Sequence, residues 1–131
     1  MRMRFSRRSI VDPIELQELI STGGEVRLID ASWGSQPVYP HKHIHNAVTF
    51  DIDIVADVSN PLPHMLPDEK GFADAVNNMG ICNQDTVIVY DQNGIHLAAS
   101  RVWWMFRCFG HKQVYVLNGG LPYWEHFRLL K

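Results

Sequence analysis

The sequence has few cysteines and little net charge, and it contains no long apolar run. Two cysteines in 131 residues are too few for a disulfide framework and fit a reducing, cytoplasmic setting. The formal net charge of −2 gives no sign of a nucleic-acid partner. A membrane helix needs roughly 18 apolar residues, and no run approaches that length, so no membrane partner is expected. These absences favour one globular domain of ordinary composition, 46% hydrophobic and 20% charged.

The first residues are basic but do not resemble a secretory signal. The segment MRMRFSRRS holds four arginines and lacks the apolar stretch that such a signal requires. We expect residues 1–8 to form a disordered basic N-terminus and residues 9–131 to form the domain. The alternative is a short organellar presequence, which would place the protein in mitochondria rather than the cytoplasm.

Strand and helix patterns alternate along the rest of the chain. Strands are predicted where β-branched and aliphatic residues cluster, at 26–30, 48–50, 86–90 and 113–117. Helices are predicted after Asp12, after Pro67 and from about Ala98, each with apolar residues at helical spacing. Strands that alternate with helices predict a mainly parallel sheet covered by helices, which is the α/β class.

The first two helices carry start signals. Asp12, Pro13 and Glu15 suit the N-cap, N1 and N3 positions, and the predicted apolar face comprises Ile14, Leu16, Leu19 and Ile20. Asp68 and Glu69 open the second helix, whose apolar face comprises Phe72, Ala75, Val76 and Met79. Between strand 48–50 and this helix lies a polar connection, residues 51–67. Its length without periodicity is unusual in a compact domain and is typical of functional segments.

The chain is organised around residues 86–111. Thr86–Tyr90 predicts a strand buried on both faces, and turn residues follow from Asp91 to Gly94. The next helix should bury one face and end at Gly110; that face comprises Ala98, Val102, Met105, Phe106 and Phe109. In open α/β sheets, ligands bind where such a strand leads into a helix N-terminus. The chemistry of the first loop residue, Asp91, is therefore the functional question.

Several side chains of this helix have predicted positions. We expect Phe106 to be more deeply buried than Trp103. One of the rings of Trp103 and Trp104 should lie in the core and the other against a neighbouring element. Cys108 is expected on the packed side, as a small core residue.

Taken together, the motifs resemble a rhodanese domain, and within that family the N-terminal domain of the two-domain thiosulfate and 3-mercaptopyruvate sulfurtransferases. The resemblance covers roughly residues 9–124, and the order and spacing of the pieces make it specific. The matching pieces are LIDASW at 28–33, HI at 43–44 with Ala47, FDID at 50–53, PLPHMLP at 61–67, GI at 80–81, VYD at 89–91, RVWWMFR at 101–107, FGH at 109–111 and LNGG at 117–120.

The resemblance implies a three-layer domain with a central five-stranded, mainly parallel sheet, and sulfur transfer through a cysteine persulfide. In catalytic members the loop after the central strand begins with the nucleophilic cysteine, and here Asp91 holds that position. A thiolate can attack sulfur and a carboxylate cannot. We therefore expect Asp91 to accept hydrogen bonds from the amides of residues 93–97 rather than to catalyse. Cys82 and Cys108 lie outside such a loop and are not expected to replace the nucleophile.

Two residues of the polar connection match assisting positions of the family. In two-domain mercaptopyruvate sulfurtransferases, the N-terminal domain lends an aspartate and a histidine to an active site whose cysteine lies in the second domain. Those positions match Asp53 and His64. A carboxylate can orient an imidazole that moves protons near a substrate carbonyl. The alternative is that both side chains cap turns around Pro61 and Pro63.

No metal site and no cofactor are expected. His41, His43 and His45 alternate and would share one face of an extended segment, which can suit zinc. His43, however, matches a structural turn of the family. Arg101 and Arg107 are expected to be ion-paired surface or interface residues.

Two readings of the function stay open. In the first, the chain is the non-catalytic half of a sulfurtransferase, inactive alone, whose partner is a second rhodanese domain that carries the cysteine. In the second, it is a stand-alone inactive module that binds a protein or an anion. A separated half should expose an apolar face and self-associate. The sequence stops at Lys131, where the family's interdomain linker would begin, and names neither the sulfur donor nor the acceptor.

Overall fold

A computed structural model describes residues 9–34, 39 and 42–130, which form an α/β domain. The expected disordered N-terminus, residues 1–8, lies outside the described residues. The described elements, in chain order, are β1 Ile10–Val11, α1 Pro13–Ser21, β2 Val26–Asp30, β3 Val48–Thr49, α2 Glu69–Asn78, β4 Thr86–Tyr90, α3 Leu97–Cys108, β5 Val114–Leu117 and α4 Gly120–Leu130.

The strands form a five-stranded, fully parallel sheet in the order β1-β5-β4-β2-β3. β4 is the central strand and pairs with β2 and β5. Its register with β2 places Asp30 beside Tyr90, at the carboxyl ends of both strands. The predicted mainly parallel α/β sheet is therefore confirmed.

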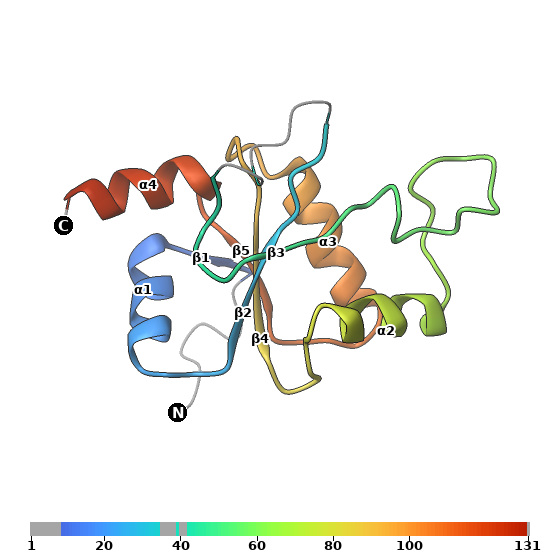
Figure 1. Cartoon of the computed structure of the whole chain (residues 1–131), viewed down its shortest axis with the longest axis horizontal. Coiled ribbons are helices and arrows are strands. Elements are labelled where there is room, and N and C mark those ends of the chain that lie inside the picture. The colour runs from blue at the N-terminus through green and yellow to red at the C-terminus, as the bar shows by residue number, and fades with distance from the viewer. Residues whose placement is uncertain (1–8, 35–38, 40–41, 131) are drawn as a thin grey trace.

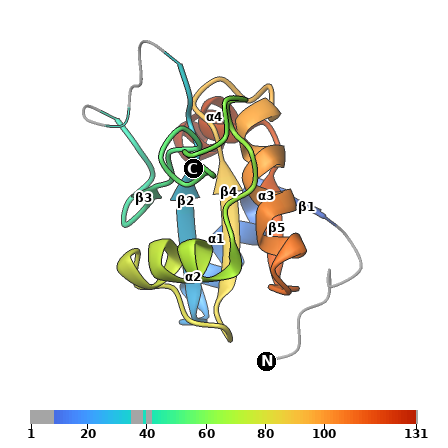
Figure 2. The ribbon, with the colours of Figure 1, turned by 90° about the vertical axis from the view of Figure 1, so that its right-hand side faces the viewer.

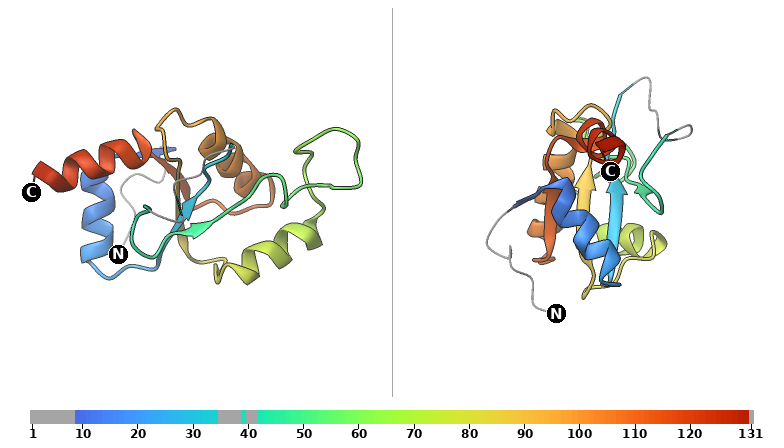
Figure 3. Two further views of the ribbon diagram at one scale, coloured as in Figure 1. Left: turned by 45° about the horizontal axis from the view of Figure 1, so that its top comes forward. Right: turned by 90° about the vertical axis from the view of Figure 1, so that its left-hand side faces the viewer.

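Helices cover both faces of this sheet, which makes three layers (Figure 1). Figure 2 shows α2 and α3 in front of one face, and the right-hand view of Figure 3 shows α1 and α4 in front of the other. β4 serves both cores: Val87 and Val89 pack with α2 and α3, whereas Ile88 and Tyr90 pack with α1 and α4. All four side chains are fully buried, as a strand with helices on both faces requires.

The predicted helix starts are confirmed. The backbone N–H of Asp12 donates to the Glu15 carboxylate at 3.0 Å, and Pro13 opens α1. Asp68 accepts from the Gly71 N–H at 2.7 Å at the start of α2. Leu16 and Leu19 are buried, but Ile14 and Ile20 are 57% and 42% exposed, so half of the predicted apolar face of α1 was wrong. α1 has nine residues, and α4 and the sheet cover only its Leu16 and Leu19 side chains.

The helix that follows the central strand, α3, buries Ala99, Val102, Met105 and Phe106. Phe106 is fully buried and Trp103 only partly so, as predicted. Cys108 is exposed, contrary to the prediction, because it lies two residues after Phe106 and so on the opposite side of the helix. Of the two tryptophans, Trp103 packs against the core and Trp104 is 43% exposed.

Two elements were not anticipated. β1 is two residues long and pairs with β5, so its existence depends on a partner about 100 residues away in the chain. α4 begins at Gly120, where the sequence indicated a turn. Its residues Leu121 and Trp124 pack against the α1 side of the sheet.

Candidate functional site at the carboxyl edge of the sheet

The residues that the sequence singled out follow strands that end at the same edge. Asp91 comes directly after β4, Trp33 lies three residues after β2, and Asp53 lies four residues after β3. Because all strands are parallel, their carboxyl ends meet at one edge, which is where open α/β sheets bind ligands.

Asp91 is buried and bonded to backbone N–H groups. It is 3% exposed, and its carboxylate accepts from the Gly94 N–H at 2.9 Å and from the Ala99 N–H at 3.4 Å. The second of these donors lies in the first turn of α3, where N–H groups lack partners within the helix. The expectation that Asp91 satisfies the loop amides and the helix start is confirmed for Gly94, and the second donor is Ala99 rather than a residue of 93–97.

The loop that follows Asp91 is tightly closed against the chain after β5. Gly94 has φ +72°, and a Cβ there would lie 2.4 Å from the Gly119 carbonyl oxygen. A Cβ on Gly120 would lie 2.5 Å from the Asp91 carbonyl oxygen, which itself accepts from the Leu121 N–H at 3.0 Å. From the other side, the Ser32 hydroxyl accepts from the Gln92 N–H at 2.9 Å. The segment after β5 and the Ser32 hydroxyl therefore hold the loop that begins with Asp91 from two sides.

Asp53 and His64 lie in contact. Nε2 of His64 is 2.5 Å from Oδ1 of Asp53, and the indole N–H of Trp33 donates to Oδ2 of the same carboxylate at 3.0 Å. The rings of Trp33 and His64 meet edge to face, with centroids 5.3 Å apart. The hydrogen bond from His64, and after it the one from Trp33, holds the pKa of Asp53 below its ordinary value of 3.8.

This contact fixes the tautomer of the imidazole. A carboxylate only accepts hydrogen bonds, so Nε2 of His64 carries the proton and the lone pair of the neutral ring lies on Nδ1. Asp53 is 60% exposed and the imidazole 27% exposed, so both groups lie within reach of a ligand. The structure brings together the two assisting residues that the sequence indicated, and their catalytic role stays a prediction.

Sequence reasoning missed the side chains that hold this pair. Trp33 lies three residues after the predicted strand 26–30, and this position was the available signal. Arg101 donates from α3 to the backbone carbonyl of His64 and lies over the Trp104 ring, 4.9 Å from its centroid. Arg107 similarly lies 5.6 Å from the Trp103 ring centroid. The arginines thus contact aromatic rings and a carbonyl rather than the carboxylates that we expected.

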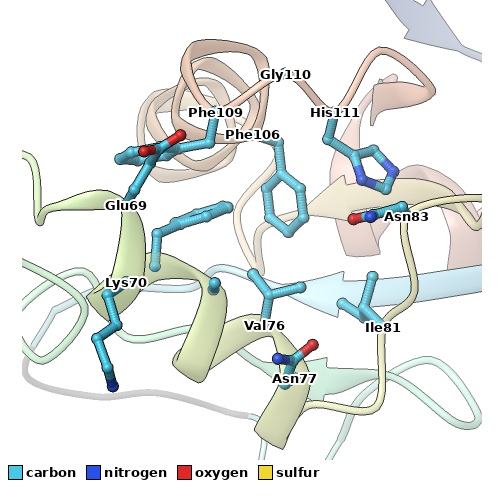
Figure 4. Close-up of a pocket in the computed structure, with 12 residues that line it drawn as sticks. Glu69, Lys70, Val76, Asn77, Ile81, Asn83, Phe106, Phe109, Gly110 and His111 are labelled. Atoms are coloured by element: carbon cyan, nitrogen blue, oxygen red, sulfur yellow. The ribbon is translucent and has the colours of Figure 1, made fainter.

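Small hollows open beside the pair. One of about 320 Å³ is lined by Trp33, Asp51 and Asp53, among others, and one of about 250 Å³ by Asp53, Asn60 and His64, among others. A larger cavity, about 590 Å³, lies between α2 and the end of α3, over the rings of Phe106 and Phe109 (Figure 4). It is at the amino edge of the sheet, and neither Asp53, His64 nor Asp91 lines it. The hollows at the carboxyl edge therefore define the candidate site.

The remaining candidates lie elsewhere. His41 is outside the described residues; Nδ1 of His43 is 2.8 Å from the Tyr39 carbonyl oxygen, and its ring stacks on Tyr39. Among the residues that the structure describes, no group of three potential ligands is arranged to hold a metal ion. Cys82 and Cys108 are both exposed, and neither lies at the carboxyl edge. Within the described ranges, no helix is long and apolar enough to cross a bilayer.

Comparison with known proteins identifies the family. The profile of the rhodanese-like domain matches residues 12–127. The chain is 48% identical over 108 residues to thiosulfate/3-mercaptopyruvate sulfurtransferase 1, mitochondrial, from Arabidopsis thaliana, which covers 77% of this chain and 28% of that protein. It is 42% identical over 127 residues to a thiosulfate sulfurtransferase from Cricetulus griseus, which covers 89% of this chain and 43% of that protein.

Solved structures agree in fold. The crystal structure of SseA from Escherichia coli, described as a 3-mercaptopyruvate sulfotransferase, superposes with a TM-score of 0.78 at 36% identity, over 92% of this chain and 48% of that one. The Tum1 protein from Saccharomyces cerevisiae gives a TM-score of 0.74 at 29% identity, over 94% and 42%. The chain spans less than half the length of each of these four relatives. Because the family profile matches nearly all of the described residues, this chain belongs to the rhodanese-like domain family.

Proposed function

We propose that this chain is the non-catalytic half of a thiosulfate/3-mercaptopyruvate sulfurtransferase and that it completes the active site of a cysteine-bearing rhodanese domain. The observation that carries the proposal is the contact between Asp53 and His64 at the carboxyl edge. The names of the Arabidopsis and hamster relatives support the reaction class. Their greater length supports the need for a second domain.

The chemistry of Asp91 supports the assignment of the nucleophile to a partner. A carboxylate bonded to the amides of Gly94 and Ala99 already fills the loop in which a catalytic thiolate would lie. It also carries negative charge, which opposes the entry of an anionic sulfur donor. The same argument counts against the alternative reading that this loop binds an anion.

The imidazole has a specific task in the proposed reaction. When a thiolate takes sulfur from 3-mercaptopyruvate, an S–S bond forms, the C–S bond breaks, and its electron pair leaves with pyruvate as the enolate. The enolate carbon then requires a proton, which His64 can deliver while Asp53 stabilises the charged imidazole. Thiosulfate instead releases sulfite, which needs no proton at this step. The pair should therefore matter more for 3-mercaptopyruvate than for thiosulfate.

Exposed apolar side chains support an interface at this edge. They lie on the polar connection, on the loop after Asp91 and at the start of α3; the set comprises Ile54, Val58, Leu62, Ile95 and Leu97. A partner domain that covers them would also enclose His64. Without that partner we expect the chain to self-associate, whereas a stand-alone module should be monomeric, so sedimentation of the isolated chain separates the two readings.

The decisive experiment joins this chain to a cysteine-bearing domain. The 131-residue chain would replace the matching part of the Arabidopsis relative, whose remaining part would supply the cysteine. Sulfur transfer to cyanide would be followed with thiosulfate and with 3-mercaptopyruvate as the donor. The isolated chain should show no turnover, and the fusion should be active. His64→Gln in the fusion should lower 3-mercaptopyruvate turnover by about 10²–10⁴-fold, the usual worth of a general acid.

The matched control is His126→Gln, which changes an exposed histidine of α4 and should leave both donors unaffected. Equal losses for thiosulfate and 3-mercaptopyruvate in the His64→Gln fusion would contradict the proton-transfer role. Turnover by the isolated chain that disappears on mutation of Cys82 or Cys108 would contradict the assignment of Asp91.

For the compartment we propose the cytoplasm, with mitochondria as the alternative, since the Arabidopsis relative is named mitochondrial. Imaging of the native gene product with a C-terminal fluorescent tag decides between them.

A further inference from the structure

We propose that Arg101 is a positioning residue that fixes the orientation of the His64 imidazole towards Asp53. The inference rests on the proposed function for its catalytic consequence, but its structural part stands on the contacts of this chain alone. Arg101 is on α3 and His64 is on the connection 51–67, so the contact joins two segments that are 37 residues apart.

The backbone of His64 needs an external restraint. His64 has φ 60°, in the left-handed region that residues other than glycine seldom adopt. Such a conformation persists only where the surroundings hold it. The guanidinium of Arg101 donates to the carbonyl oxygen of this same residue, and thereby fixes the peptide plane from which the side chain projects.

The guanidinium is itself held in place. Its carbon lies 4.9 Å from the centroid of the Trp104 ring, a residue one turn further along α3. Its Nε is buried and meets no hydrogen-bond partner among the described residues. A buried donor without an acceptor is unfavourable for stability and is rare in native structures, so the placement of this guanidinium requires an explanation. We take its contact with the His64 carbonyl as that explanation: the arginine is placed where it holds the backbone of His64.

α3 also begins at the Asp91 loop, at Leu97. Arg101 therefore ties the exposed connection to the rigid helix that follows the central strand. The distance between the imidazole and a cysteine-bearing domain docked at this edge would be set through that helix. Loss of Arg101 should leave the imidazole present but variably oriented.

The first test uses the 131-residue chain with ¹⁵N-labelled histidine. Among its seven histidines, the ring signals of His64 are identified by His64→Gln. Asp53→Asn should shift the ring ¹⁵N signals of His64 in the wild-type background, because it removes the charged acceptor. In the Arg101→Met background, the same Asp53→Asn shift should fall by about half or more, because the imidazole and the carboxylate no longer meet in one geometry.

The control and the rescue make the result specific. Arg107→Met removes the other arginine that stacks on a tryptophan of α3 and should leave the response of His64 to Asp53→Asn unchanged. Arg101→Lys keeps a charged donor and should restore part of the response. If Arg101→Met does not fold, Arg101→Gln, with its shorter neutral amide, replaces it in the same comparison. An undiminished response in the folded variant overturns the inference.

The second test uses the fusion with the cysteine-bearing domain. Arg101→Met should lower kcat for 3-mercaptopyruvate about tenfold or more, with KM and the thiosulfate rate little changed, because only the proton transfer depends on the orientation of His64. If Arg101→Met reduces the NMR response but His64→Gln has no effect on turnover, the positioning role stands and the proposed function fails. If His64→Gln lowers turnover but Arg101→Met changes neither readout, the proposed function stands and the positioning role fails.

Discussion

Two aspartates at the same edge of the sheet have opposite environments. Asp91 is 3% exposed and bonded to backbone N–H groups, whereas Asp53 is 60% exposed and bonded to the side chains of His64 and Trp33. Backbone donors cannot move away without disturbing the loop, so Asp91 is part of the structure. Side-chain donors can exchange partners, so the pair at Asp53 is available for chemistry. We therefore propose that the position of the family nucleophile is structural in this domain and that the chemical groups lie on the neighbouring connection.

Both regions depend on α3. Its first turn donates the Ala99 N–H to Asp91, and its Arg101 donates to the backbone carbonyl of His64. The two environments therefore persist only while α3 is firmly anchored. Phe106 is the largest fully buried side chain of α3, and its ring centroid lies 5.1 Å from that of Phe72 and 6.1 Å from that of Phe50.

The largest effect should follow from removal of that side chain. Phe106→Ala should lower the free energy of unfolding by about 3–5 kcal/mol, through lost burial and the cavity left behind. Denaturant unfolding measures it, and Trp104→Ala on the exposed side of the same helix is the control with a much smaller loss. Equal midpoints for the two variants would show that α3 is not packed through its Phe106 face.

The next prediction addresses the contrast directly. Asp91→Ala leaves the N–H groups of Gly94 and Ala99 without their acceptor in a buried site, and should lower the free energy of unfolding by about 2–3 kcal/mol. Asp53→Ala should leave the denaturation midpoint near that of the wild type, since its partners are accessible to water. If Asp53→Ala proved the more destabilising, the division into a structural and a chemical aspartate would be wrong.

The fold was largely predictable because its signals are local. Thr86–Tyr90 is a continuous run of strand-forming residues, and Asp68 marks the start of α2 within one turn. β1 could not be found this way, because two residues carry no periodicity and their strand exists only through pairing with β5. α4 was missed because Gly119, Gly120 and Pro122 indicate a turn, although proline is well tolerated in the first turn of a helix.

The site was predictable only in part. Asp91, Asp53 and His64 were indicated by their positions in a family pattern, and their placement at one edge follows from parallel strands. The contact from Arg101 could not be inferred, because it depends on the left-handed backbone of His64 and on a long-range approach of α3 to the connection. The residues next to Arg101 in the sequence give no indication of this contact.

A smaller effect should appear when a thiol replaces the buried carboxylate. In Asp91→Cys, the amides of Gly94 and Ala99 would favour the thiolate, so its alkylation by iodoacetamide should persist to lower pH than that of Cys82 or Cys108. Burial limits the access of the reagent, so the pH at which the rate falls is the informative quantity, and peptide mass mapping reads it for each thiol. A pH dependence equal to that of the exposed Cys82 would show that the loop does not favour an anion.

The smallest effect concerns Asp53 and the pH dependence of stability. Hydrogen bonds from His64, and then from Trp33, hold the pKa of Asp53 below its ordinary value of 3.8. Since the folded value is the lower one, the ionised carboxylate stabilises the fold above pH 3.8, and this contribution disappears as the pH falls through the folded pKa. The wild-type protein should therefore lose slightly more stability than Asp53→Asn as the pH is lowered from about 5 to below 3.8, because an aspartate titrates over this span.

The effect is small because Asp53 is exposed and water and salt screen its interactions. Denaturation midpoints at stepped pH and low salt would measure it. Asp74→Asn is the matched control, because it removes an exposed carboxylate that pairs with Lys70 on α2, away from the carboxyl edge. His64→Gln should reproduce the flattened pH profile of Asp53→Asn, since His64 supplies the main hydrogen bond to the carboxylate. If His64→Gln kept the wild-type profile, the two side chains would not be paired in solution, and the edge would lack the chemical group on which its contrast with Asp91 depends.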